Sequence, residues 1–225
     1  MNIRTRALIF STFFGSCVAL GLLLVSLTTN HWVRATPRRS TAPESKGEVN
    51  YGLFYGNIDL DSGIGLRTTS VNVYTLLQTE PDTMNFWLWL ITTLSTGFAL
   101  LSCAIGAIAA VLKAASAARK RPSMVLLFAS NISAAVTQVV AFITWLVHFY
   151  QYLIHNVLTV KDIELKWYSH GLAYLGYSFY LVIASTLVVL LNLIILLYAR
   201  RSEVRNGHRL EPPSEQKNIS AIMLY

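Results

Sequence analysis

The residues best suited to chemistry in this sequence are histidines, because an imidazole can bind a metal ion or carry a proton. Four of the five, His31, His148, His155 and His170, lie in or beside two loops between apolar stretches. His148 and His155 are about 10 Å apart along a helix, whereas ligand pairs prefer a spacing of four residues. We therefore expect ordinary hydrogen-bonded histidines, with no metal site and no cofactor.

Residues for catalysis or cross-linking are equally sparse. The sequence has no nucleotide-binding loop, no paired catalytic carboxylates and no nucleophile beside a base, and Ser169-His170 alone carries no such meaning. Cys17 and Cys103 both lie in long apolar stretches, where they are expected to act as small apolar fillers. The sequence therefore predicts a protein that is not an enzyme and whose loops contain no disulfide.

The elements that position these residues follow from a composition that is 54% hydrophobic and 13% charged, as in membrane proteins. Stretches 7–30, 83–112, 122–147 and 171–199 contain no Asp, Glu, Lys or Arg. About 20 helical residues cross the hydrocarbon core, where backbone amides have no water partner, so each stretch predicts a spanning helix. The first is longer than a signal peptide's apolar core of about 7–15 residues and is expected to stay uncleaved.

Basic residues predict the orientation of these helices. Eleven of the 18 Lys and Arg residues lie in the N-terminus, between the second and third stretches, or after the fourth. The positive-inside rule places these segments in the cytosol, and all five tryptophans then fall near the outer ends of the spans, as in an interfacial belt. The net charge of +7 is explained by a basic collar facing anionic lipid, without nucleic acid.

The predicted chain is thus a multi-pass protein of the lipid bilayer, most simply of the plasma membrane. Its segments are a cytosolic N-terminus (1–6), a first span (7–30), a first extracellular loop (31–85), a second span (86–112), a basic cytosolic loop (113–122), a third span (123–147), a second extracellular loop (148–170), a fourth span (171–199) and a cytosolic tail (200–225).

Small and amide residues predict how the helices associate. Gly15 and Gly106 each belong to a row of small residues at four-residue spacing, which lets helix backbones approach closely. Asn131, Gln138 and Asn192 are expected to face the bundle interior, since lipid would leave their amides without partners. A polar transport path is the alternative, but no acid or base lies within a span. The small-residue faces permit a homo-oligomer without requiring one.

The first long loop predicts a small sheet. Large and small residues alternate in 51–56, as in a strand with one buried face whose glycines relieve crowding. Val71 and Val73 indicate a further short strand or edge, whereas 36–47 is polar, contains Pro and Gly, and is typical of a mobile loop. The predicted fold is an α-helical integral membrane protein, a four-transmembrane-helix bundle with a small extracellular antiparallel β-sheet.

Two short motifs carry a family resemblance. Trp32 follows the first span and precedes Val33-Arg34-Ala35-Thr36, and the loop continues to Tyr51-Gly52-Leu53-Phe54-Tyr55-Gly56. Four spans, cytosolic termini and this Trp resemble the claudin and peripheral-myelin-protein superfamily. Claudins have Gly-Leu-Trp where Gly52-Leu53-Phe54 stands here, followed by two disulfide-forming cysteines that are absent from this loop. The closer resemblance is to clarins, in both motifs and in the chain end Met223-Leu224-Tyr225.

The resemblance implies a role rather than a reaction. Clarins are membrane organisers of sensory cells, tied to hair-bundle and synapse architecture, the actin cortex and the placement of calcium channels. The implied function is a non-catalytic tetraspan organiser that links membrane partners to a cytosolic scaffold. An auxiliary subunit or trafficking factor of an ion channel, similar to calcium-channel gamma subunits, is the main alternative. A claudin-type junction or adhesion protein, with charges such as Arg34 and Asp59 lining a path, is the third.

The end of the chain predicts a scaffold contact. Ile222, Met223, Leu224 and Tyr225 follow a segment that contains two prolines. PDZ domains capture a free terminal carboxylate and add the peptide as a strand, with pockets for alternate side chains. Tyr225 and Met223 would occupy those pockets. The alternative is an apolar terminus that only touches lipid.

Overall fold

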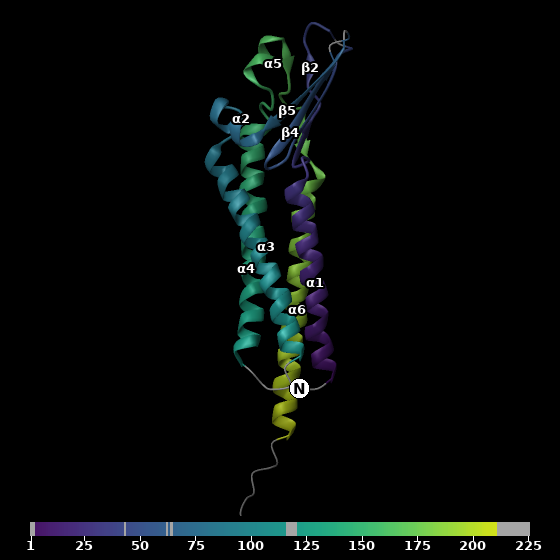
Figure 1. Ribbon diagram of the computed structural model, residues 1–225, viewed down its shortest axis with the longest axis vertical. Helices are drawn as coiled ribbons and strands as arrows, with labels where there is room; N and C mark the ends of the chain where they lie inside the picture. Colours follow the sequence, from purple (N-terminus) through teal and green to yellow (C-terminus); the bar gives the residue numbers. More distant parts are fainter. Residues whose placement is uncertain (1–2, 43, 62, 64, 116–120, 211–225) are drawn as a thin grey trace, which may run out of the picture.

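Four long helices dominate the structure, a computed structural model that describes residues 3–42, 44–61, 63, 65–115 and 121–210 (Figure 1). They are α1 (Ile3–Thr28), α3 (Phe86–Ala115), α4 (Arg121–His148) and α6 (Tyr177–Leu210). Each is long and apolar enough to cross a membrane, α4 together with its π-helical continuation η1 (Phe149–Leu153). Two short helices, α2 (Val73–Thr79) and α5 (Val160–Glu164), lie between them in the chain. The prediction of four apolar helices is confirmed.

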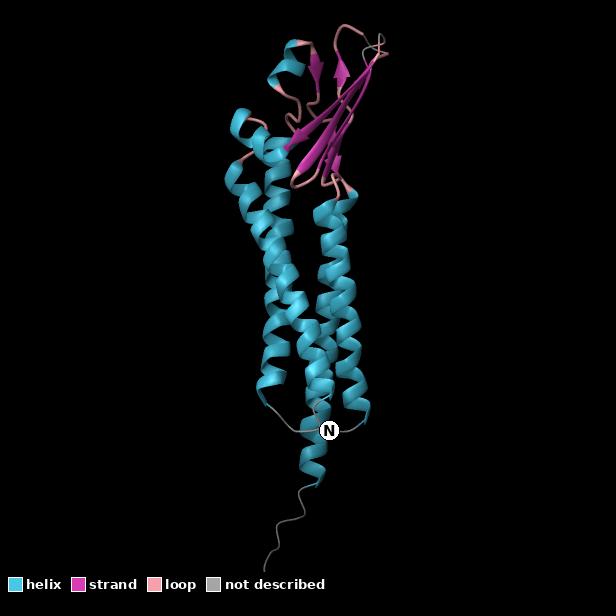
Figure 2. Cartoon of the chain, viewed as in Figure 1, coloured by secondary structure: helices cyan, strands magenta, loops and turns pink. Residues whose placement is uncertain are grey.

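All the strands lie beyond one end of the bundle, which we call the sheet end (Figure 2). A five-stranded sheet has the order β5-β4-β3-β1-β7, and a two-stranded sheet pairs β2 with β6. Every pairing is antiparallel, which confirms the predicted small antiparallel sheet. The strands are β1 (Val33–Ala35), β2 (Arg38–Arg39), β3 (Lys46–Tyr51), β4 (Tyr55–Asp61), β5 (Leu66–Asn72), β6 (Trp167–Tyr168) and β7 (Ala173–Leu175).

Strand β1 joins the two connecting segments of the sheet end into one unit. Val33 lies opposite Tyr51 of β3 on one side and opposite Leu175 of β7 on the other. The segment before α6 therefore completes the sheet that begins after α1. For the same reason α6 begins only at Tyr177, although the apolar stretch in the sequence begins six residues earlier.

Two expectations about the first loop are wrong. Residues 36–47 are not simply a loop, because Arg38–Arg39 pairs with β6 and Lys46 and Gly47 belong to β3. Val73 is not a strand residue, because Asn72 accepts a hydrogen bond from Tyr74 N at 2.9 Å and caps α2. Both cases depend on partners distant in sequence or on a cap, which alternation alone does not reveal.

The bundle is a ring in which α1 contacts α3 and α6, and α4 contacts α3 and α6. Gly15 of α1 lies directly against Asn192 of α6, so that a Cβ at Gly15 would overlap the Asn192 side chain. The amide of Asn192 is buried and donates to Thr12 O and to Ser16 Oγ, both at 3.3 Å. The glycine thus makes room for a polar link between two helices.

Gln138 links three helices in the bundle interior. Its Nε2 donates to Cys103 Sγ of α3 at 3.8 Å, and its Oε1 accepts from Thr186 Oγ1 of α6 at 3.1 Å. Gln138 is fully buried, and these two hydrogen bonds give both ends of its amide a partner where water cannot reach them.

Gly106 and Asn131 meet where α3 packs on α4. A Cβ at Gly106 would lie 3.2 Å from Ser130 Oγ and 3.5 Å from Asn131 Nδ2. The Asn131 amide nevertheless donates to Leu127 O of its own helix, at 2.8 Å. Within the described residues, Asn131 is therefore buried without making the kind of interhelical hydrogen bond that Asn192 and Gln138 make.

We predict that Gly15→Ala destabilises the protein by about 1–3 kcal/mol, the usual cost of overpacking a filled interior. The new methyl group would displace the Asn192 amide from the acceptors that it shares with α1. The matched control is Gly21→Ala on the same helix, where a Cβ would meet nothing within 4 Å. Unfolding in detergent measures both variants, and equal stability of the two would contradict the Gly15–Asn192 contact.

Candidate functional site: the junction between the sheet and the bundle

Trp32 is buried at the junction between α1 and the sheet. Its side chain has 0% exposure, and its Nε1 donates to Ser26 O at 2.7 Å. Its ring packs edge-on against Trp145 of α4, with the ring centroids 5.0 Å apart. The end of α1, the start of β1 and the upper part of α4 therefore share one aromatic contact.

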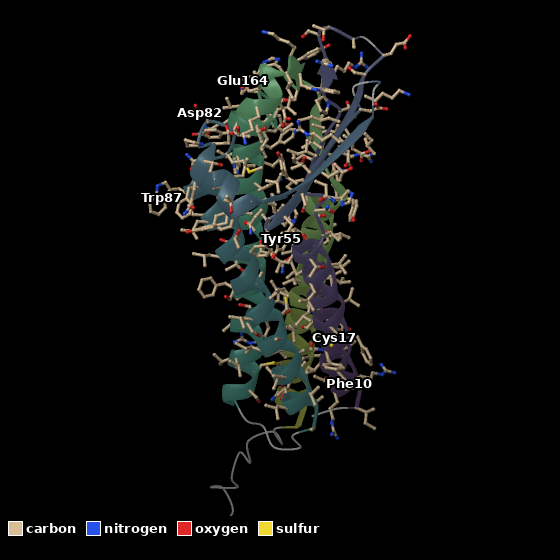
Figure 3. The ribbon with its side chains drawn as sticks, turned by 45° about the horizontal axis from the view of Figure 1, so that its top comes forward. Phe10, Cys17, Tyr55, Asp82, Trp87 and Glu164 are labelled. Carbon is tan, nitrogen blue, oxygen red and sulfur yellow. The ribbon has the colours of Figure 1, made fainter. Side chains whose placement is uncertain are left out.

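The expectation that all five tryptophans form an interfacial belt is wrong. Trp32, Trp145, Trp167 and Trp89 are at most 7% exposed, and only Trp87 is largely exposed, at 67%. Trp87 points away from α3 in Figure 3, as an interfacial residue would. The buried rings pack inside the protein, and the indole N–H groups of Trp32 and Trp89 donate to carbonyls, which makes burial of those two rings favourable.

The motif 51–56 is a hairpin turn rather than a single alternating strand. Gly52 N donates to Tyr55 O at 2.8 Å and closes the turn between β3 and β4. Leu53, at the turn, is fully buried, and its carbonyl accepts from Trp89 Nε1 at 2.7 Å. Phe54 is 41% exposed, and its carbonyl accepts from Val73 N at 2.9 Å. The turn thus reaches α3 and α2 through its backbone carbonyls.

The two glycines of this motif allow close approaches. A Cβ at Gly52 would lie 2.5 Å from Thr29 O and 2.8 Å from Asn30 Cα, so only glycine lets the turn lie on the end of α1. Gly56 lies opposite Tyr51 in the β3–β4 pairing, and a Cβ there would overlap the Tyr51 ring. The glycines therefore fix the turn against the bundle and leave space for one buried tyrosine.

Tyr51 connects the sheet to the segment between η1 and α6. Its ring is fully buried, and its hydroxyl donates to Val157 O at 2.9 Å. Burial, together with the nearby carboxylates of Asp162 and Glu80, raises the pKa of Tyr51 above its ordinary value, because each disfavours the phenolate.

An ion pair between a half-exposed arginine and a buried carboxylate makes a second connection to the same segment. Asp162 of α5 is fully buried, and its Oδ1 pairs with Arg67 Nη2 of β5 at 2.5 Å. Its Oδ2 accepts from Thr159 Oγ1 at 2.7 Å. At the end of α2, Glu80 Oε1 accepts from Val160 N at 3.2 Å. The segment is thereby attached to both the sheet and α2.

An exposed apolar surface remains at the far tip of the sheet end, and we call it the tip patch. It comprises Val160, Ile163, Leu165 and Tyr168, which are 45–54% exposed. Glu164, in the middle of this run, lies in the upper part of Figure 3, at the sheet end. Lys166 has a left-handed backbone (φ 68°) and turns the chain from α5 into β6.

The other predicted residues have different surroundings. Arg34, considered for a charged path, forms an ion pair with Glu48 at 2.9 Å, with both side chains 43% exposed. Such exposed pairs contribute only about 0–1 kcal/mol.

The predicted PDZ ligand (Ile222, Met223, Leu224, Tyr225) lies outside the described residues. Trp89 and Trp145 belong to the junction, although their positions in the sequence predicted the interfacial belt. A position near the end of a span is compatible with either location, so the sequence did not distinguish them.

We predict that Tyr51→Phe lowers the free energy of unfolding by about 0.5–1.5 kcal/mol at pH 8, because Val157 O loses its donor. The folded state holds the Tyr51 proton more tightly than the unfolded state, so this contribution is complete below pH 10 and is lost as the pH rises above it. The gap between wild type and variant should then shrink by up to about 1.4 kcal/mol per pH unit. Tyr168→Phe, at an exposed position, is the control and should leave the free energy of unfolding at pH 8 nearly unchanged.

Comparison with known proteins does not assign the chain to a family. No family model matches it, and a search of the curated proteins finds no match. The resemblance of Trp32 and 51–56 to clarins therefore stays an interpretation of those residues. What the chain does has to be inferred from the junction that they build and from the surfaces around it.

Proposed function

We propose that this chain is a non-catalytic tetraspan organiser of the plasma membrane, with the sheet end outside the cell and both termini in the cytosol. In this proposal the tip patch binds a membrane or adhesion partner, and the C-terminus binds a cytosolic scaffold at the actin cortex. The clarin-like motifs support a setting in sensory cells or synapses. The orientation follows from the basic residues of the sequence.

The observation that carries the proposal is the contrast between a tightly joined junction and an exposed apolar tip. Trp32, Tyr51 and Leu53 are fully buried and hydrogen-bonded to other elements, so the sheet has a defined position on the bundle. The tip patch carries large apolar side chains on and beside α5, which lies beyond the end of the bundle in Figure 1. Grouped apolar side chains in such a place are typical of protein interaction sites.

The arrangement suits a spacer better than a reaction centre. The residues that the motif brings together are apolar or hydrogen-bonded to backbone, and their contacts are used in holding elements in place. A partner bound at the tip would be held at a set height and direction relative to the four helices. That is what a protein needs in order to position other membrane proteins.

We predict that Ile163→Glu weakens capture of the partner, because a charge in an apolar contact removes the burial that drives binding. The drop in recovered partner should be at least about tenfold, or ~1.4 kcal/mol. Tyr174→Glu, on β7 of the same sheet end and similarly exposed, is the matched control and should retain the partner.

The measurement is proximity labelling at the sheet end in native cells, followed by co-purification of the labelled proteins with each variant. Equal recovery with wild type and Ile163→Glu would contradict a role for the tip patch. Recovery of a pore-forming channel subunit in stoichiometric amounts would instead favour the role of an auxiliary channel subunit.

The scaffold contact makes a separate prediction. A peptide with the C-terminal residues of this chain should be captured by a PDZ panel, and amidation of Tyr225 or addition of one residue should abolish capture, because the free carboxylate is lost. In cells, deletion of Tyr225 should remove the scaffold from the labelling of the tail. Capture that is unchanged by amidation would count against the contact.

A further inference from the structure

Two histidines that are distant in sequence meet at the sheet end. His155 follows η1, and His170 follows β6. The distance between His155 Nδ1 and His170 Nε2 is 3.4 Å. Their ring centroids are 5.5 Å apart and the rings are tilted by 38°. Both residues are exposed, so solvent ions can reach them. The sequence analysis compared His155 with His148 instead, because those two can lie on one helix.

The backbones that carry the two histidines are linked on both sides of the pair. Gly171 N donates to Ile154 O at 2.9 Å. Ser169 Oγ accepts from Val157 N at 3.1 Å and donates to Asn156 Oδ1 at 3.2 Å. Each histidine therefore has a linked residue immediately beside it, and the two backbone segments that carry the rings are held close together.

The geometry of the pair matches a particular metal. A tetrahedral Zn²⁺ ion with Zn–N bonds of about 2.0–2.1 Å holds two ligand nitrogens about 3.3–3.4 Å apart. The observed separation of His155 Nδ1 and His170 Nε2 is 3.4 Å. Imidazole nitrogens suit Zn²⁺ and similar transition metals, whereas Ca²⁺ and Mg²⁺ require oxygen ligands.

We propose that His155 and His170 form a zinc-binding site at the sheet end, with water or a donor from a bound partner at the remaining positions. Among the described residues, no third His, Cys, Asp or Glu completes a metal-binding group with them. The ion would take the lone pairs of His155 Nδ1 and His170 Nε2. Without metal, one of these two nitrogens carries a hydrogen and donates it to the other. When zinc binds, that hydrogen would move through solvent to the second nitrogen of the ring that carried it, so both rings stay neutral.

Zinc at this position would link two parts of the same segment. His155 lies at the end of the α4–η1 helix, and His170 precedes the turn into β7. An ion that binds both would strengthen the existing backbone links and stabilise the folded protein by mass action. The open coordination positions would let a partner side chain join the site, which makes the sheet end responsive to zinc in its surroundings.

The test uses the full chain in lipid nanodiscs, titrated with zinc sulfate and followed by calorimetry. We expect one zinc ion per chain at this site, and His155→Gln or His170→Gln should each weaken binding by at least about tenfold, because one of two protein ligands is lost. The double variant, which retains neither protein ligand, should bind more weakly than either single variant. His31→Gln is the matched control, because His31 stacks on Tyr177, away from the pair, and should leave affinity unchanged.

A second measurement needs no variant. Zinc should protect His155 and His170 of the wild-type chain from modification by diethyl pyrocarbonate, as read by mass spectrometry, and calcium should not. Absence of zinc binding to the wild type, wild-type affinity in both His→Gln variants, or equal modification with and without zinc would each overturn the proposal.

Discussion

The structure depends on the burial of Trp32 where α1 ends and the sheet begins. Its indole N–H donates to Ser26 O within the last turns of α1, and its ring packs against Trp145 of α4. This contact ties the first residue of the sheet region to two helices at once. A large ring that is fully buried contributes apolar burial, and the hydrogen bond of its N–H offsets the cost of removing that group from water.

The hairpin turn at 51–56 adds to this contact and fixes the orientation of the sheet relative to the helices. Gly52 lets the turn lie on the end of α1, and the carbonyl of Leu53 accepts from Trp89 of α3. Tyr51 then reaches the segment before α6 through Val157. Sheet and helices therefore share one core, and no disulfide is needed among these described residues to hold the sheet in place.

This construction explains how the proposed roles can coexist. The aromatic and glycine residues of the motif form the junction, whereas the tip patch and the His155–His170 pair stay exposed beyond it. Partner binding and zinc binding would both act at the sheet end without disturbing the bundle. The interior polar links, such as Gln138 between α3 and α6, stabilise the helices independently of either event.

The sequence alone determined the four apolar helices, because uncharged stretches of that length have one stable form in a lipid bilayer. It also predicted a small sheet and buried amides at Gln138 and Asn192. Only the tertiary structure decided that 51–56 is a turn, that Trp32 is a core residue and that His155 meets His170. Hydropathy and alternation report how a residue relates to its chain neighbours, whereas these three outcomes depend on contacts between segments far apart in the chain.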